Sequence, residues 1–424
     1  MAADKEAIIY FLQTVVACYL TPIFAGLRIT TGPCMIQLKV VDKQSVTHKL
    51  VGLDHLRAFA ICYVFFYHYG GIFAHPDWVH DIGQFGWTGV DLFFVLSGFL
   101  ISSQLFAKIA SAKKISLKEF FIKRFFRIIP PYLVIVALYF LFPLLRERES
   151  PAPLWKYLTF TQNLGLDLRT QGTFSHAWSL CIEEQFYLFM PLILLLLAYF
   201  KMIKKGVLVL LSLFVAGIFI RAQLFSHQVA PYADNGSIIQ WYKWIYYPTW
   251  SRLDGLLTGV SIAAIMQFKP RLQQAIQRNG NLTLLLSLPL LIAAYFLCKE
   301  QTSFAASVVG FPLVSLGYGL MVAGAVSPSG ILYRLQSKTT AVFARLSYVV
   351  YLSHKIVIHI TQEQFAKLNI EKDSNLMMFI CVITSLLAAL LLNKIIEKPF
   401  LLLRNKVLHA QQDSVPQKAP EMQL

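Results

Sequence analysis

The chain has 424 residues, of which 56% are hydrophobic and 14% are charged, and its formal net charge at pH 7 is +16. A soluble globular protein usually carries about a quarter charged residues, and apolar runs of membrane-spanning length recur throughout this sequence, so the composition excludes an ordinary soluble protein. Basic loops at a membrane surface explain the positive charge more simply than a nucleic-acid partner does.

An N-terminal extension, residues 1–49, precedes the regular part of the sequence. It contains an apolar segment at 7–27 that is long enough to insert as an extra helix, followed by a basic lead-in. The segment lacks the basic start and the clear cleavage site of a signal peptide. Met35 stands before the basic lead-in and is an alternative initiator, so we expect residues 1–34 to be dispensable.

Ten apolar segments follow the extension, and a membrane protein satisfies its backbone hydrogen bonds most simply by forming a helix from each. We therefore predict an all-α, polytopic transmembrane helical bundle of about ten spanning helices, plus a possible extra N-terminal helix. The predicted spans are 54–73, 88–107, 128–145, 178–199, 206–225, 252–268, 281–298, 305–326, 342–362 and 376–396.

The distribution of Lys and Arg predicts which side each connection occupies. The connection 108–127 is strongly basic, whereas 74–87 contains no Lys or Arg. This alternation places both ends of the ten-span unit, including the polar tail 401–424, in the cytoplasm. The first predicted span then begins on the cytoplasmic side and ends in the outer half of the membrane.

Arg57 and His68 lie eleven residues apart in the first predicted span. At about 100° per residue, eleven steps complete about three turns, so both side chains share one helix face, separated by about 16 Å along the axis. Ionisable residues inside a membrane are costly and are usually functional. Each residue alone fits a snorkelling arginine or a core histidine, but the pair on one face favours a functional site.

Asp91 opens the second predicted span at a depth comparable with that of His68. It can orient the imidazole or bind substrate hydroxyls, and a carboxylate that the helix dipole stabilises explains it equally well. Ser97 and Gly98, further along this span, favour close approach of a neighbouring helix.

Arg124 and Arg127 share a helix face at i, i+3. Guanidinium groups suit phosphate, so these arginines favour the binding of a cytoplasmic polyanion such as coenzyme A phosphates. The alternative is positive-inside anchoring, which explains the neighbouring lysines well. Glu183 and Glu184 lie about one turn into the fourth predicted span, where a carboxylate needs a partner or a polar cavity. His68, Arg57 and Arg252 are candidate partners for one of them.

His354, in the ninth predicted span, is a second intramembrane histidine, and a satisfied core histidine is as good an explanation as a functional role. The six cysteines are scattered and form no CxxC, so we predict neither a disulfide framework nor a metal site. The substrate-binding candidates are Trp178, Tyr187, Ser97, Arg252 and His354.

An ordered set of motifs from about Leu50 to Phe400 resembles the membrane-bound acyltransferase family 3. The motifs are Arg57-(ten residues)-His68, Phe93-Phe-Val-Leu-Ser97-Gly98, Arg124-Phe-Phe-Arg127-Ile-Ile-Pro130, Trp178-Ser-Leu-Cys-Ile-Glu183-Glu184-Gln-Phe-Tyr187, Tyr351-Leu-Ser-His354 and Glu397-Lys-Pro-Phe400.

The resemblance implies a membrane domain over 50–400 and a bacterial inner-membrane enzyme. Such an enzyme moves an acyl group, often acetyl, from cytoplasmic acyl-coenzyme A to a hydroxyl of an extracytoplasmic glycan, such as O-antigen or exopolysaccharide, or of a smaller molecule. Many relatives also carry a C-terminal esterase-like domain, and we expect no such domain after the membrane unit here.

On this interpretation Arg57, Arg124 and Arg127 hold the donor, and His68 is the general base or accepts the acyl group itself. Glu184, Glu183 or Asp91 orients His68. The alternative is a transporter or flippase for a glycan or lipid, whose expected mark is a pair of interrupted helices in repeated halves. No such pair is evident in the sequence.

Overall fold

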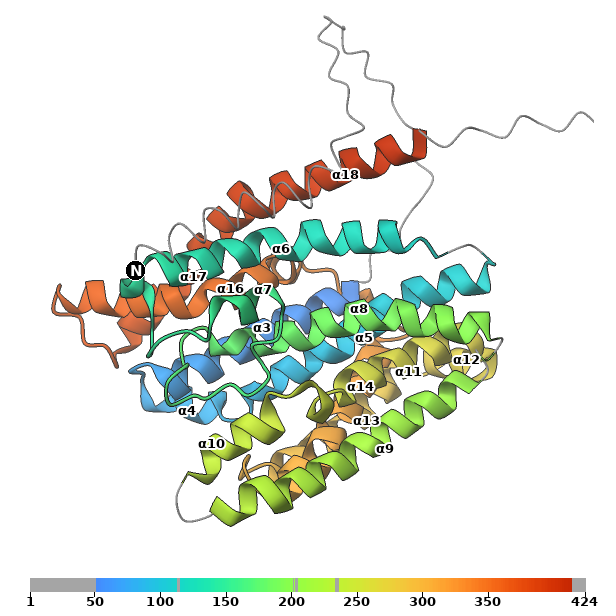
Figure 1. Ribbon diagram of the computed structural model, residues 1–424, viewed down its shortest axis with the longest axis horizontal. Coiled ribbons are helices and arrows are strands. Elements are labelled where there is room, and N and C mark those ends of the chain that lie inside the picture. The colour runs from blue at the N-terminus through green and yellow to red at the C-terminus, as the bar shows by residue number, and fades with distance from the viewer. Residues whose placement is uncertain (1–50, 113–114, 201, 203–204, 233–235, 414–424) are drawn as a thin grey trace, which may run out of the picture. The chain divides into compact units, whose positions relative to one another are not determined.

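The computed structural model describes residues 51–112, 115–200, 202, 205–232 and 236–413 (Figure 1). Over these ranges the chain is a bundle of α-helices, and one isolated β-bridge joins Pro151 to Thr173. The prediction of an all-α bundle is therefore confirmed. The predicted N-terminal extension, with its apolar segment at 7–27, lies outside the described residues. The predicted polar tail begins as a helix that continues to Asp413.

Every predicted span overlaps a long helix. These helices are α3 (Val51–Ile72), α5 (Gly89–Ala110), α6 (Leu117–Leu141), α8 (Trp178–Tyr199), α9 (Gly206–Leu224), α11 (Asp254–Phe268), α13 (Gly280–Leu297), α14 (Phe311–Ala325), α16 (Lys338–Ala366) and α17 (Asn375–Leu392). Among the described residues, 8 helical stretches are long and apolar enough to cross a membrane. The two remaining predicted spans are α3, which carries Arg57 and His68, and α11, which has 15 residues.

The other α-helices of the described residues connect or extend these. They are α4 (Asp77–Gly83), α7 (Leu154–Leu158), α10 (Ser237–Trp241), α12 (Pro270–Arg278), α15 (Ile331–Arg334) and α18 (Lys398–Asp413). In Figure 1, α4 and α10 lie toward the left end of the bundle and α12 toward the right end.

The third long helix begins well before its predicted start at 128. Ser116 caps α6, because its side chain accepts a hydrogen bond from the backbone N–H of Glu119, and the helix then runs from Leu117. Much of the basic connection predicted over 108–127 is therefore helical, and Arg124 and Arg127 lie in the first half of α6. Basic residues lowered the apolarity of this half, so hydropathy alone placed the boundary too late.

A central group of helices surrounds α3 and α5. Helix α3 packs against α16, α5 and α14, and α5 also packs closely against α11. Burial follows this arrangement, since 72% of the apolar window of α14 is buried inside the bundle, against 11% of that of α9. The polar residues of α3 therefore lie within the protein, while α9 presents apolar side chains to the outside, as a lipid-facing helix does.

Two glycines allow the close packing of α5 against α11. A Cβ atom on Gly98 would collide with the backbone oxygen of Leu256, and one on Gly259 would collide with that of Val95. Small residues at such positions let helix backbones approach closely. The contact brings the start of α5, with Asp91, beside the chain entering α11, with Arg252.

Candidate active site

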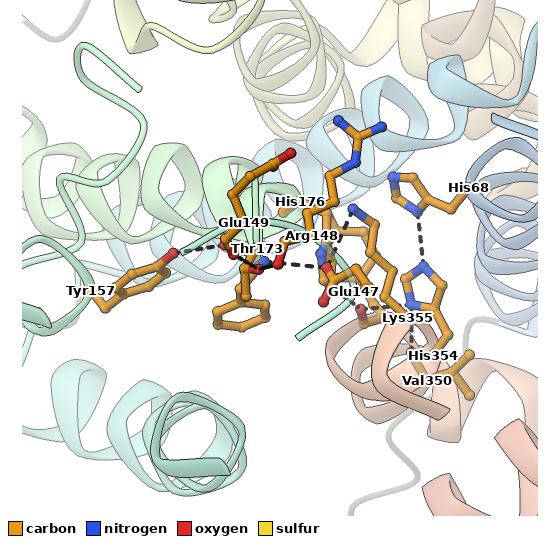
Figure 2. Close-up of polar contacts among 12 residues, drawn as sticks. His68, Glu147, Arg148, Glu149, Tyr157, Thr173, His176, Val350, His354 and Lys355 are labelled. Carbon is orange, nitrogen blue, oxygen red and sulfur yellow. Dashed lines mark hydrogen bonds and ion pairs between the residues drawn. The ribbon is translucent and has the colours of Figure 1, made fainter. Parts of the chain in front are cut away.

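Three histidines from distant parts of the sequence meet inside the bundle. His68 lies near the end of α3, His354 in the middle of α16, and His176 immediately before α8. His68 Nδ1 is 2.8 Å from His354 Nε2 (Figure 2). The ring centroid of His176 is 5.6 Å from that of His68 and 5.2 Å from that of His354. The packing of α3 against α16 thus turns separate intramembrane histidines into one cluster.

Backbone carbonyls determine which ring nitrogen of His354 carries a hydrogen. His354 Nδ1 lies 3.0 Å from the oxygen of Val350 and 2.9 Å from that of Tyr351. A carbonyl only accepts, so Nδ1 is the donor, and the neutral ring then has its lone pair at Nε2. His68 consequently donates from Nδ1 to His354. The remaining nitrogen of His68, Nε2, keeps a lone pair, which is the state a general base requires.

His176 is fixed in a related way. Its Nε2 lies 3.1 Å from the oxygen of Tyr351, so this nitrogen donates and Nδ1 keeps the lone pair. The Tyr351 hydroxyl in turn donates to the backbone oxygen of His176 at 2.6 Å. His176 Nδ1 is buried and has no hydrogen-bond partner among the described residues. It is therefore an acceptor available to a ligand.

A buried ion pair lies next to the histidines. Lys355 Nζ is 3.9 Å from Glu147 Oε1, and the two side chains are 2% and 0% exposed. The Glu147 carboxylate also accepts a hydrogen bond from the backbone N–H of Phe174 at 3.3 Å. The pair thus ties α16 to the connection between α6 and α8.

These groups line a cavity of about 140 Å³, which we call the outer cavity because the charge distribution predicts that this end of α3 faces away from the cytoplasm. Its polar lining includes His68, His176, Lys355 and Arg148. Aromatic residues form much of the rest, namely Tyr67, Trp87, Trp178, Tyr242, Tyr246, Tyr247 and Tyr351. Among the described residues, no group of side chains is placed to hold a metal ion.

Arg252 and Asp91 form a second buried ion pair behind this aromatic lining. Arg252 Nη2 lies 2.9 Å from Asp91 Oδ1 and 3.0 Å from Oδ2. The guanidinium carbon is 4.8 Å from the ring centroid of Tyr246 and 5.4 Å from that of Trp178, both of which line the cavity. The structure therefore pairs Asp91 with Arg252, while the residue that orients the His68 ring is His354.

A separate cluster surrounds Arg57, toward the other end of α3. The Arg57 guanidinium forms an ion pair of 3.4 Å with Asp54, one turn earlier. Arg127 is close enough for its like charge to repel that of Arg57. Tyr187 donates a hydrogen bond of 2.7 Å to Glu183, and the Arg124 guanidinium lies 5.5 Å from the Tyr187 ring centroid. We call this group, completed by Ser97 and Glu184, the arginine cluster.

The structure thus divides most of the predicted site residues between two places. His68 and His354 meet at the outer cavity, where Trp178 also lies. Arg57, Arg124, Arg127, Glu183, Glu184, Tyr187 and Ser97 gather in the arginine cluster. The two glutamates therefore have arginines and Tyr187 as neighbours rather than His68. Asp91 and Arg252 belong to neither group and form a pair behind the cavity wall.

Sequence reasoning missed several residues of the outer cavity. Lys355 directly follows His354 in an apolar span, and an intramembrane lysine is itself a signal of function. His176 stands just before the fourth predicted span and was not assigned a role. Glu147 and Arg148 lie in a mixed-charge connection whose fold no periodicity describes, so nothing in the sequence placed them beside His68.

The sequence that forms these two clusters matches a known protein family. A sequence model of the family described as Acyltransferase domain (Acyl_transf_3) matches residues 50–394. The chain is 28% identical over 340 residues to O-acetyltransferase OatA of Staphylococcus aureus (strain NCTC 8325 / PS 47), which covers 76% of this chain and 52% of the relative. It is 29% identical over 405 residues to the protein named "Putative O-acetyltransferase SAR0937" of Staphylococcus aureus (strain MRSA252), covering 90% of this chain and 62% of the relative.

The chain therefore spans about half to three fifths of the length of these curated relatives. No solved structure gives a significant match to it. The family match covers the predicted resemblance from its first motif nearly to its last, and with it both the outer cavity and the arginine cluster. This chain is thus a multi-pass membrane protein that belongs to the Acyl_transf_3 family of acyltransferases.

Proposed function

We propose that this protein is an integral-membrane O-acetyltransferase, which moves an acetyl group from cytoplasmic acetyl-coenzyme A to a hydroxyl of an extracytoplasmic glycan. The observation that carries the proposal is the state of His68. Its Nδ1 is committed to His354, and its Nε2 keeps a lone pair on a ring that lines the outer cavity. The names of the relatives as O-acetyltransferases support the choice of acetyl and of a hydroxyl acceptor.

In the direct route, His68 Nε2 takes the proton of the acceptor hydroxyl as its oxygen attacks the thioester carbonyl. The new C–O bond forms, the C–S bond breaks, and the imidazolium returns the proton to the thiolate, giving the acetyl ester and coenzyme A. In the covalent route, Nε2 attacks the thioester carbonyl, the C–S bond breaks and the coenzyme A thiolate leaves. The acceptor hydroxyl then attacks the acetyl-histidine, the C–N bond breaks to free the imidazole, and the hydroxyl proton passes to the thiolate. Both routes require the Nε2 lone pair that His354 preserves.

The arginine cluster is the proposed site for the donor's phosphates. Arg57, Arg124 and Arg127 can offer guanidinium groups, which bind phosphate with two parallel hydrogen bonds. The separation of Arg57 from His68 along α3, about 16 Å, leaves room for an extended pantetheine arm between the phosphates and the reacting carbon. The donor would thus bind at one end of α3 and react at the other.

Family membership favours this enzyme over the transporter or flippase alternative. The alternative to a glycan as the acceptor is a smaller hydroxyl compound. The localisation that follows from the proposal is the bacterial cytoplasmic membrane. There acyl-coenzyme A is available on one face and the growing surface glycan on the other.

Mass spectrometry of surface glycans tests the proposal. Cells that express the full chain should carry acetyl esters that are absent from cells without it and from cells with His68→Ala at equal membrane abundance. Feeding labelled acetate should place the label in the glycan ester. If the glycans of the two strains are identical while a labelled glycan precursor crosses the membrane only in the presence of the protein, the transporter interpretation is correct instead.

A further inference from the structure

The outer cavity carries positive charge without a matching acid in its lining. Arg148 and Lys355 are both lining residues, and none of the lining residues is an Asp or a Glu. A concave surface with charges of one sign concentrates ligands of the opposite sign. The cavity is thus suited to a ligand that brings a negative charge of its own.

Arg148 is the cation that is free to bind such a ligand. Its backbone is held, because its carbonyl oxygen accepts a hydrogen bond of 2.9 Å from the Thr173 hydroxyl. Its guanidinium forms no ion pair or side-chain hydrogen bond with another described residue. Figure 2 shows this side chain extending into the region where the His68 ring and the Lys355 ammonium also lie. Arg148 therefore combines a held backbone with an exposed, unpaired guanidinium that lines the same cavity as His68, an arrangement suited to recognition.

Lys355 has a different part in the same cavity. It is buried and paired with Glu147, so it anchors the loop that carries Arg148. The ammonium has three donors, and the contact with Glu147, at 3.9 Å, is at the long limit of an ion pair. The pair therefore sets the position of Arg148 without cancelling the positive charge of that residue.

The remaining walls fit a ring-shaped, amphipathic ligand. Trp178, Tyr246 and Tyr247 are lining residues whose side chains combine an apolar ring with a polar N–H or O–H group, a combination that suits the apolar surface and hydroxyls of a pyranose. Burial raises the pKa of Tyr242 above its ordinary value, so this phenol stays neutral and adds no negative charge to the wall. His176 Nδ1 offers a buried, unpartnered acceptor for a sugar hydroxyl.

We infer that the acceptor is a saccharide with an anionic group, a carboxylate or a phosphate, near the hydroxyl that is acetylated, and that Arg148 binds this group. The inference rests on the proposed function and specifies its acceptor. Guanidinium binds either anion through two parallel hydrogen bonds. Arg148 would thus determine which saccharide is acetylated, while His68 performs the transfer.

The test uses the purified full chain in lipid nanodiscs with acetyl-coenzyme A and matched acceptors. Each p-nitrophenyl glycoside of a uronic acid, in the gluco, galacto and manno series, is compared with its neutral uronamide. Each glycoside 6-phosphate is compared with the parent glycoside, so that the two anions are distinguished. We expect the anionic member of a pair to be acetylated with a kcat/KM at least about tenfold higher, since a hydrogen bond to a charged group contributes about 1.5–3 kcal/mol.

Two substitutions connect this preference to Arg148. Arg148→Gln should reduce the preference to near unity, mainly by raising the KM of the anionic acceptor, and Arg148→Lys should retain part of it. Arg169→Gln is the matched control, because Arg169, like Arg148, is an exposed arginine of the same connection but does not line the cavity. It should leave the preference unchanged.

The outcomes separate this inference from the proposed function. Equal use of anionic and neutral acceptors, or a preference that survives Arg148→Gln, overturns the inference and leaves an O-acetyltransferase with a neutral acceptor. If none of the saccharides is acetylated and cells expressing the protein show no acetylated glycan, the proposed function fails and the inference fails with it.

Discussion

His68 and His354, 286 residues apart in the sequence, are joined by a hydrogen bond of 2.8 Å from Nδ1 to Nε2. In many hydrolases a carboxylate occupies the equivalent place behind the catalytic histidine. Here a neutral imidazole, itself fixed by two backbone carbonyls, has that position. The arrangement orients His68 without placing a negative charge beside it.

The first prediction concerns His68 itself. His68→Ala should reduce acetyl transfer by at least about 10²-fold, because a general base contributes about 10²–10⁴-fold to such a step. Radiolabelled acetyl transfer in nanodiscs measures this, with protein abundance and melting temperature as controls. A variant that folds normally and acetylates at the wild-type rate would rule out both chemical routes through this residue.

The second prediction separates positioning from structure at His354. His354→Leu removes the acceptor of the His68 Nδ1–H bond, so kcat should fall by about 10–100-fold while the KM of the donor stays near its wild-type value. His354→Gln restores an amide oxygen that can accept this bond and should recover part of kcat. Equal loss in both variants at equal thermal stability would mean that the hydrogen bond does not set the activity.

The third prediction concerns the pair formed by Asp91 and Arg252. Asp91→Ala leaves a buried guanidinium without its counter-ion and should destabilise the protein by about 3–5 kcal/mol. The double variant Asp91→Leu/Arg252→Met replaces the pair with apolar groups and should recover much of that stability. Thermal unfolding in detergent measures both. If the single variant is as stable as the wild type, the pair is not needed to support the aromatic wall.

The fourth prediction concerns donor binding at Arg57. Arg57→Lys keeps a positive charge but loses the planar fork that binds phosphate, so the KM for acetyl-coenzyme A should rise several-fold while the KM of the acceptor changes little. Lys108→Gln offers a matched control. Lys108 lies at the end of α5, outside the arginine cluster, and pairs with Glu119 of α6. An unchanged donor KM in Arg57→Ala would show that this arginine is an anchor.

The fifth prediction tests the contact between α5 and α11. Gly98→Val would place a branched side chain against the backbone of Leu256, so the helices must separate. We expect a lower melting temperature and loss of transfer, whereas Ser97→Ala, one position earlier, should retain the fold. Wild-type stability in Gly98→Val would show that the helices can separate at little cost.

Hydropathy was sufficient to locate the helices, because a membrane span must be continuous, apolar and about 20 residues long. It located α3 and α11 even though neither meets a strict test of length and apolarity. The helical period also placed Arg57 and His68 on one face of α3. These predictions depend on local properties of the chain, and local properties can be read from a single sequence.

The partners of each side chain could not be read in this way. The contact of His68 with His354 depends on α3 packing against α16, and that of Asp91 with Arg252 depends on α5 packing against α11. Glu183 and Glu184 were expected near His68 among other candidates, yet they lie with Arg57 and Arg124. Adjacency in a bundle depends on helix order in space, which periodicity does not encode.

The placing of Arg57 and His68 on one continuous helix has a consequence for the choice of donor. Helix α3 runs without a break from Val51 to Ile72, so the spacing between the two residues cannot adjust to the ligand. A rigid helix of this kind fixes the distance between the proposed phosphate site at Arg57 and the reacting carbon at His68. A donor such as acetyl phosphate, with its anion next to the acyl carbon, would reach one residue only. If the proposed function is correct, the enzyme should reject short activated acetyl compounds whatever their chemical reactivity and should need a carrier with a long flexible arm.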